Sequence, residues 1–242
     1  MPSLLADRTT ILLTGATSGV GAALNRQLLA EGHELVTVSR SAMTNGEASI
    51  GYSCDLSDPE AVVAVCTMLK DQHPDIGVII NNAGVQYATK LVDTAPDQVV
   101  EEALLNLVAP ALIAQAFLPA LLGRNDRSAI VNVSSGLAFF PKEATSLYCA
   151  TKAGLHSLTQ SLRYACEGTK VIISEAILPL VATPMTEGRG RGRGKMSAED
   201  AARAIIAGLK AHRSEIWIGK ARLIPPIQRL APSLGRALLR RG

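Results

Sequence analysis

Apolar and polar positions alternate along the chain in blocks that predict strands and helices in turn. Short runs rich in β-branched residues are typical of strands buried on both faces of a sheet. The predicted strands are Thr10 to Thr14, Glu34 to Ser39, Ala48 to Cys54, Val78 to Ile80, Ala129 to Ser134, Lys170 to Leu178 and Glu215 to Ile218. Segments with helical spacing separate most of these runs. This alternation predicts a single doubly wound α/β domain with a mainly parallel sheet.

Five longer segments have the spacing or the cap residues of helices. They are Ala22 to Glu31, a helix capped by Asp58 that ends at Gln72, Ala103 to Gly123, a helix that carries Tyr148 and continues toward Cys166, and Ser197 to Ala211. The segment Ala103 to Gly123 has no charged side chain and is long enough for a membrane span. Because Asn106, Pro110, Gln115 and Pro119 interrupt it, we expect a helix buried between the sheet and a partner subunit instead.

The last quarter of the chain changes in composition twice. Glycine and arginine alternate from Gly188 to Gly194, so residues 187–195 are predicted to form a flexible, solvated loop rather than a contact for a polyanion. Residues 220–242 mix basic and apolar side chains. This basic tail could lie on an acidic membrane surface, but we expect it to pack on the domain or on a neighbouring subunit. The chain thus divides into a domain of residues 1–219 and a C-terminal tail.

Overall composition narrows the classes of function. The formal net charge of +3 is too small to indicate a polyanion partner, and with 3% aromatic residues a stacking surface for nucleic acid is not expected. Cys54, Cys66, Cys149 and Cys166 have neither a metal-like nor a paired spacing. The N-terminus lacks the apolar core of a signal peptide. We therefore expect a reduced, cytoplasmic protein without a metal.

A glycine-rich turn follows the first predicted strand. Thr14-Gly15-Ala16-Thr17-Ser18-Gly19-Val20-Gly21 leads directly into a helix, so backbone N–H groups and the positive helix end can approach a pyrophosphate. The second strand ends in Ser39-Arg40. In dinucleotide folds an acid near this place binds the ribose hydroxyls of NAD, whereas an arginine accommodates the 2′-phosphate of NADP. These features predict a Rossmann-type domain that binds a dinucleotide and prefers NADP(H).

A second constellation of residues carries possible chemistry. Tyr148 and Lys152 are four residues apart at the start of a predicted helix, which puts them on one helical face. A nearby ammonium favours the phenolate and brings a phenol with a pKa near ~10 closer to working range. Ser134-Ser135 ends a predicted strand, where ligands collect in parallel sheets. By itself the tyrosine-lysine spacing also fits a helix with an ordinary surface lysine.

Together these residues resemble the classical short-chain dehydrogenase/reductase family over nearly the whole chain to about residue 219. Thr14 to Gly21 is similar to its cofactor turn, and Asn81-Asn82-Ala83-Gly84 to a further family motif. Asn106, Ser135, Tyr148 and Lys152 match the positions of its catalytic tetrad, and Ser135 is preferred to Ser134 because of its distance from Tyr148. The resemblance implies cofactor contacts from Gly15, Thr17, Ser18, Gly19, Val20, Gly21, Arg40, Asp55, Leu56, Asn82, Ala83, Gly84, Tyr148, Lys152, Val181 and Thr183.

The resemblance also implies a reaction, namely the interconversion of a carbonyl and an alcohol by hydride transfer. Tyr148 would pass the proton, Lys152 would lower the tyrosine pKa and hold the nicotinamide ribose, Ser135 would bind the substrate oxygen, and Asn106 would help to position a relay water. The resemblance implies a small carbonyl or alcohol compound as the substrate. It also implies that the chain assembles into a homodimer or homotetramer. Leu178-Pro179 replaces the family's usual Pro-Gly, which weakens the assignment of Val181 and Thr183.

Two other classes of function stay open from the sequence. A non-catalytic NADP(H)-binding redox sensor or interaction protein would use the same fold, although it has no need of a proton relay. The alternative of a membrane-associated or polyanion-binding protein is supported only by the arginine-glycine stretch and the basic tail. In these two segments the chain resembles a bacterial subgroup of the family that is named after the lipoteichoic-acid alanylation operon. This resemblance does not identify a substrate.

Overall fold

A computed structural model describes the chain except for residues 1–3, 6–7, 43–47, 189–193, 234 and 236–242. The described residues form a seven-stranded parallel sheet in the order β3-β2-β1-β4-β5-β6-β7. Its strands are β1 (Thr10–Thr14), β2 (Glu34–Ser39), β3 (Ser49–Ser53), β4 (Val78–Asn81), β5 (Ser128–Ser135), β6 (Val171–Leu178) and β7 (Glu215–Trp217). The winding reverses between β1 and β4, and ligands bind beyond the carboxyl ends of strands at such a switch point. The predicted doubly wound Rossmann-type fold is confirmed.

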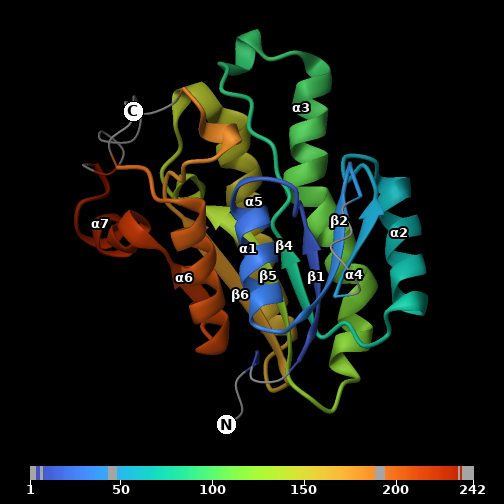
Figure 1. The fold of residues 1–242 in the computed structure, drawn as a ribbon. Coiled ribbons are helices and arrows are strands. Elements are labelled where there is room, and N and C mark those ends of the chain that lie inside the picture. Colours follow the sequence, from blue (N-terminus) through green and yellow to red (C-terminus); the bar gives the residue numbers. More distant parts are fainter. Residues whose placement is uncertain (1–3, 6–7, 43–47, 189–193, 234, 236–242) are drawn as a thin grey trace.

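Helices cover both faces of the sheet (Figure 1). On one face lie α1 (Gly19–Ala30) and α6 (Ala198–Lys210), side by side. On the other face lie α2 (Pro59–Gln72), α4 (Ala109–Leu122) and α5 (Ser146–Ala165). The remaining helices are α3 (Pro96–Ala103), which leads into α4, and α7 (Ile224–Leu230) near the C-terminal end.

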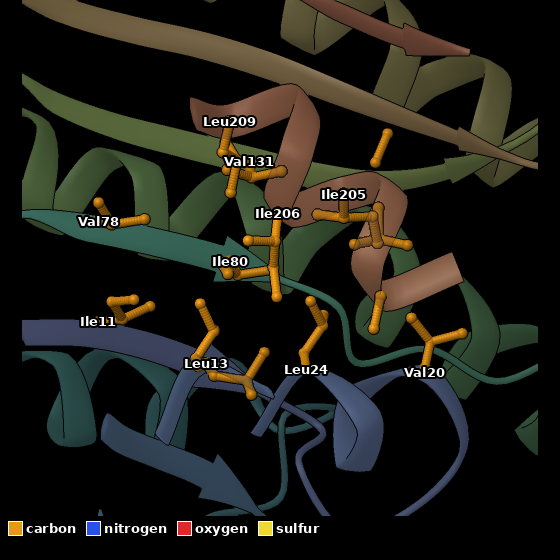
Figure 2. Packing of buried hydrophobic residues seen from close by; sticks show 14 of the residues in the cluster. Ile11, Leu13, Val20, Leu24, Val78, Ile80, Val131, Ile205, Ile206 and Leu209 are labelled. Atoms are coloured by element: carbon orange, nitrogen blue, oxygen red, sulfur yellow. The ribbon is translucent and has the colours of Figure 1, made fainter. Parts of the chain in front are cut away.

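The larger hydrophobic core lies between the sheet and the pair α1 and α6. Figure 2 shows apolar side chains of the strands meeting those of the two helices, with Ile11, Leu13, Val78, Ile80 and Val131 opposite Leu24, Ile205, Ile206 and Leu209. Each of these side chains is at most 3% exposed. Burial of one such side chain stabilises the fold by about 1.5–3 kcal/mol. This core fixes β1 and β4, whose ends bear the glycine turn and the Asn81 to Gly84 segment.

The helix predicted over Ala103 to Gly123 starts earlier than the sequence suggested and is not uniform. It begins at Pro96, because proline is favoured in the first helical turn, and the polar residues that follow hid this start. A five-residue π-helix, Leu104–Val108, joins α3 to α4. Such π turns widen the hydrogen-bond ladder locally and often occur at functional sites. Here the π turn brings Asn106 fully into the interior, at 0% exposure.

This helical segment is also the one described segment that could cross a membrane by length and composition. Pro96–Leu122 has a mean hydropathy of 1.8 in its most apolar window, of which 39% is buried. Its buried members include Ile113, Phe117 and Leu121, which contact β-strand residues and α2 in the second hydrophobic core. That packing favours a helix on the core over a membrane span, while the partner subunit expected on its other side stays a prediction.

A buried amide bridge ties the helix α5 to the centre of the sheet. Asn81 Nδ2 on β4 donates to Asn132 Oδ1 on β5 at 2.8 Å. Asn132 Nδ2 in turn donates to Thr159 Oγ1 on α5, also at 2.8 Å. All three side chains are at most 3% exposed. Because buried amides are costly without partners, the chain of hydrogen bonds specifies the register of α5 on the sheet.

We expect Asn132→Ala to lower the free energy of unfolding by about 1–3 kcal/mol, since it leaves Asn81 and Thr159 without their partner. Urea denaturation followed by circular dichroism measures this change. Asn125→Ala is the matched control, because Asn125 is exposed and its backbone carbonyl, not its side chain, accepts from Lys170. Equal stabilities of the two variants would contradict the structural role of the bridge.

Candidate active site

The glycine turn after β1 depends on close contacts between backbone segments. Gly15 and Gly19 have positive φ angles of 69° and 52°, which glycine adopts without strain. At Gly21 a Cβ atom would lie 1.9 Å from the carbonyl oxygen of Gly15. A side chain at Gly15 would meet the backbone of Ala83 at 2.8 Å. The turn therefore lies directly against the segment that follows β4, with no room for side chains.

The N-terminus of α1 is open to an anion. The helix begins at Gly19, three residues earlier than predicted, so Val20 and Gly21 form its first turn. The side chain of the cap residue Ser18 makes no capping hydrogen bond, and the first turn contains no acid. Thr17 and Ser18 are exposed. Free N–H groups at a positive helix end are the donors that a pyrophosphate requires, so this turn fits a dinucleotide.

Hydrogen bonds of Thr14 and Asn82 clamp the turn to the end of β4. Thr14 Oγ1 accepts from the backbone N–H groups of Asn82 and Ala83, both at 3.0 Å. The Asn82 side chain donates to the carbonyls of Thr14 and Gly15, at 3.0 and 3.1 Å. The two predicted cofactor motifs are thus parts of one rigid unit. Thr14 was not predicted to act in this way, although its position before the glycines was visible.

The loop after β6 approaches the same turn from the opposite side. A Cβ atom on Gly19 would lie 2.9 Å from Cγ2 of Thr183, which brings Thr183 next to the glycine turn. Val181 is buried and pairs with Met196 in an isolated parallel bridge. Thr186 Oγ1 donates to the Val181 carbonyl at 2.5 Å. Despite Leu178-Pro179, Thr183 therefore lies at the glycine turn, and Thr186 holds the Val181 carbonyl near it in the chain. The contact of both residues with the nicotinamide amide stays a prediction.

The far end of the site contains Arg40 and Asp55. Arg40 is exposed at the end of β2, and its carbonyl accepts a hydrogen bond from Ser53 Oγ at 2.8 Å. Asp55 accepts from the hydroxyl and the backbone N–H of Ser57, and these hydrogen bonds lower the pKa of Asp55, with a smaller contribution from the Arg40 charge. Leu56 is buried beside them. Arg40 thus has an exposed guanidinium at the point where the sequence predicts a 2′-phosphate.

Asn106 and Lys152, two members of the predicted tetrad, meet at Gly84, which is the last residue of the Asn-Asn-Ala-Gly motif. A Cβ atom on Gly84 would lie 2.9 Å from Asn106 Oδ1 and 3.8 Å from Lys152 Nζ. Asn106 Oδ1 accepts a hydrogen bond from the Val85 N–H at 2.9 Å. Asn106 Nδ2 donates to the Val85 carbonyl at 2.8 Å and to Thr151 Oγ1 at 3.3 Å. Its side chain therefore bridges the β4 loop to α5. The predicted role of Asn106 in positioning a water stays a prediction.

Lys152 is a buried ammonium beside the phenol of Tyr148. Its Nζ atom lies 5.6 Å from the centre of the Tyr148 ring and donates to the Val133 carbonyl at 2.9 Å. The residue is 4% exposed. Burial lowers the pKa of Lys152 to about 8, while the negative charges of Glu175 and Glu102 act in the opposite direction. Tyr148 itself is half-buried in the first turn of α5.

The two serines at the end of β5 differ in accessibility. Ser135 is half-buried, and its Oγ accepts from the Leu137 N–H at 3.2 Å, which leaves its own proton free to reach a ligand. Ser134 is 2% exposed. This difference favours Ser135 as the residue that meets a substrate, in agreement with the sequence-based choice. Within the described part of the chain, no group of three or more metal-ligating side chains could hold a metal ion.

Sequence reasoning missed the acidic groups that surround Lys152. Glu102 on α3 and Glu175 on β6 are 1% and 0% exposed. An acid within the apolar run Lys170 to Leu178 was a visible signal, but its partners come from a different element and could not be read from the run. The predicted loop 187–195 lies largely outside the described residues, since the structure describes only its ends.

Comparisons with known proteins agree with this geometry. Residues 9–194 match the family model for short chain dehydrogenases. An uncharacterised oxidoreductase of Bacillus subtilis, DltE, is 32% identical over 219 residues, which are 86% of this chain and 86% of that protein. These matches show the family.

Solved structures support the fold as well. A short-chain dehydrogenase from Burkholderia cenocepacia in complex with NADP has a TM-score of 0.86 at 24% identity, over 96% of this chain and 98% of that one. One from Burkholderia phymatum in complex with NAD has a TM-score of 0.80 at 22% identity, over 93% and 95%. The chain belongs to the short-chain dehydrogenase/reductase family and is an NAD(P)-dependent oxidoreductase.

Proposed function

We propose that the protein is an NADP(H)-dependent oxidoreductase that interconverts a carbonyl and an alcohol, with Tyr148, Lys152, Ser135 and Asn106 as its catalytic residues. The observation that carries this proposal is the ammonium of Lys152, 5.6 Å from the Tyr148 ring and held next to Gly84 at the edge of the cofactor cradle. A buried cation beside a half-buried phenol is an expensive arrangement that packing alone does not require. It is the arrangement that a proton-transferring tyrosine needs.

The chain's own residues would hold the dinucleotide along the switch point of the sheet. The N-terminus of α1, from Gly19 to Gly21, would bind the pyrophosphate, and Asp55 with Leu56 would contact the adenine end. Asn82, Ala83 and Gly84 would line the middle, while Val181 and Thr183 would bind the nicotinamide amide. When bound, the nicotinamide supplies or accepts the hydride.

Proton transfer falls to Tyr148. In reduction the phenol donates its proton to the oxygen of the substrate carbonyl, and in oxidation the phenolate removes the proton of the alcohol. Ser135 donates a hydrogen bond to the same oxygen. The ammonium of Lys152 stabilises the phenolate form of Tyr148 and donates to the nicotinamide ribose. Asn106, held next to Gly84 by Val85 and Thr151, would help to position a relay water.

Arg40 supports a preference for NADP(H). Its guanidinium is exposed at the end of β2. The nearby carboxylate of Asp55, whose pKa the Arg40 charge lowers slightly, accepts its hydrogen bonds from Ser57 and not from Arg40. Relatives of this chain occur in complex with NADP and with NAD, so the preference depends on the residues of this chain. The position in the glycine turn where a second basic residue often helps is Ser18. The preference should accordingly be modest.

Self-association is the remaining part of the proposal. The segment Pro96–Leu122 has a mean hydropathy of 1.8 in a window that is only 39% buried, and Leu122 and Tyr164 on α4 and α5 are 45% and 75% exposed. Apolar surface exposed on helices that cover one face of the sheet is best covered by a second copy of the same surface. We propose a homodimer or homotetramer through α4 and α5. The cytoplasmic location stays a prediction.

We expect Tyr148→Phe to lower kcat by at least about 100-fold, the low end for a positioned acid or base. The change removes the phenolic proton and keeps the ring, so the cofactor affinity should stay near that of the wild type. A panel of ketones, aldehydes and alcohols, followed by nicotinamide absorbance, identifies the substrate for the measurement. Tyr164→Phe, on the exposed side of the same helix, is the control. Near-normal turnover in the Tyr148 variant, or cofactor binding by the wild type without turnover of any substrate, would favour the redox sensor.

We expect the wild type to bind NADPH roughly 10-fold more tightly than NADH, because one charge-assisted hydrogen bond contributes about 1.5–3 kcal/mol. Arg40→Ala should abolish this difference by weakening NADPH binding only. Fluorescence titration of both cofactors measures the affinities. Arg203→Ala, which removes an exposed arginine on α6, should leave them unchanged. A preference that survives the Arg40 substitution would show that another residue selects the cofactor.

Light scattering tests the assembly. At micromolar concentration we expect the mass of a dimer or tetramer, and Leu122→Asp combined with Tyr164→Asp should shift it toward the monomer, since buried charges oppose association. Leu230→Asp on α7, where Leu230 is 80% exposed, is the control and should keep the wild-type mass. A wild type that is monomeric in solution would exclude the proposed interface.

A further inference from the structure

A buried acid lies beneath the helix that carries Tyr148 and Lys152. Glu175 on β6 is 0% exposed and pairs in register with Asn132 on β5. Residues in register on neighbouring parallel strands point to the same face of the sheet. Since the Asn132 side chain binds Thr159 of α5, Glu175 also faces α5.

The partners of Glu175 confirm this direction and come from the same helix. His156 Nδ1 lies 2.7 Å from Glu175 Oε2, and Arg163 Nη2 lies 3.8 Å from the same oxygen. Glu175 raises the pKa of His156 by this hydrogen bond. Arg163 is shared with Glu215 on β7, at 3.4 Å, and Glu215 accepts from Trp217 Nε1 at 2.9 Å. The described residues offer no partner to the second oxygen of Glu175.

Lys152 belongs to the same face of α5. Lys152, His156 and Arg163 follow one another at intervals of four and seven residues, which aligns their side chains along one side of a helix. The ionisable groups around Lys152 come from three elements: Tyr148 on α5, Glu102 on α3 and Glu175 on β6. Of the two acids, Glu175 has the larger influence on the lysine.

We propose that Glu175 is a positioning residue for Lys152, held in place by His156 and Arg163, whose buried carboxylate keeps the lysine charged in a site that excludes water. This inference rests on the proposed function, because Glu175 can affect turnover and cofactor binding only if Lys152 has the roles proposed for it. His156 and Arg163 both approach Oε2 of Glu175 and hold this carboxyl group against α5. The arrangement extends the site from the carboxyl edge of the sheet into its interior.

Removal of the Glu175 charge should change the pH dependence of turnover and of cofactor binding, whereas a merely structural role of Glu175 would leave it unchanged. Without the carboxylate, Lys152 should lose its proton at a lower pH, since an opposite charge favours the charged form of a group. The neutral amine would then neither stabilise the Tyr148 phenolate nor bind the nicotinamide ribose as a cation. Both the turnover and the affinity for the cofactor should therefore decline at a lower pH than in the wild type.

The experiment compares Glu175→Gln with the wild type in two pH series that extend on both sides of about 8, the pKa of Lys152. One series measures kcat for alcohol oxidation, and the other measures the dissociation constant of NADPH by fluorescence. We expect the alkaline decline in both series to move by about one unit to lower pH, the low end for one opposite charge. Glu175→Asp retains the charge and should restore most of the wild-type profile.

Glu215→Gln is the matched control, because Glu215 contacts Arg163 in the same cluster, whereas the acids that raise the pKa of Lys152 are Glu175 and Glu102. Its profiles should overlay those of the wild type. If Glu175→Gln does not fold, the double variant Glu175→Gln with His156→Gln replaces both members of the pair with amides and is read in the same way. A profile of the Glu175 variant that coincides with that of Glu215→Gln would overturn the inference.

Failure of the proposed function has a different signature. In that case Lys152→Met would leave the turnover and the NADPH affinity of the wild type unchanged, whatever the Glu175 variants do. If Lys152→Met abolishes turnover while Glu175→Gln keeps the wild-type pH profile, the proposed function holds and the positioning role of Glu175 is wrong.

Discussion

Burial of the Lys152 ammonium is the constraint on which the arrangement of the site depends. Moving a charge out of water costs several kcal/mol unless hydrogen bonds and opposite charges compensate it. The Val133 carbonyl supplies a hydrogen bond at 2.9 Å, and Glu102 and Glu175 supply the charges. Three elements of the fold must therefore meet around one nitrogen atom. Burial lowers the pKa of Lys152 to about 8 although the two acids act in the opposite direction, so desolvation outweighs the compensation from their charges.

Contacts also connect the glycine turn with the helix α5, which bears Tyr148 and Lys152. Thr14 and Asn82 fix the turn to the end of β4, and Gly84 continues from there to within van der Waals distance of Asn106. Asn106 in turn binds Thr151, the neighbour of Lys152 on α5. A series of hydrogen bonds and close contacts thus connects the N-terminal end of α1 with the helix α5, which bears Tyr148 and Lys152.

The sequence predicted the strands well because parallel strands buried on both faces appear as continuous apolar runs. It predicted Tyr148 and Lys152 on one face of a helix for a similar reason, since that relation is local. The π turn at Leu104–Val108 could not be predicted in this way, because it exists through the contact of Asn106 with Val85, which lies on a different element. Glu175 was visible as an acid, but His156 and Arg163 become its partners only through the register of α5 on β6.

The described part of the C-terminal segment packs on the domain, which is one of the two positions that we expect for it from its composition. Ile224 is 8% exposed and belongs to a small core with Phe140 and Ile177. At Gly136, the residue after Ser135, a Cβ atom would lie 2.6 Å from Cδ1 of Ile224. A side chain at Gly136 would therefore have to displace the end of the Ile224 side chain, which lies in the first turn of α7. The packing of α7 on the domain thus reaches the residue next to Ser135 and places apolar residues of the C-terminal segment at the border of the candidate active site.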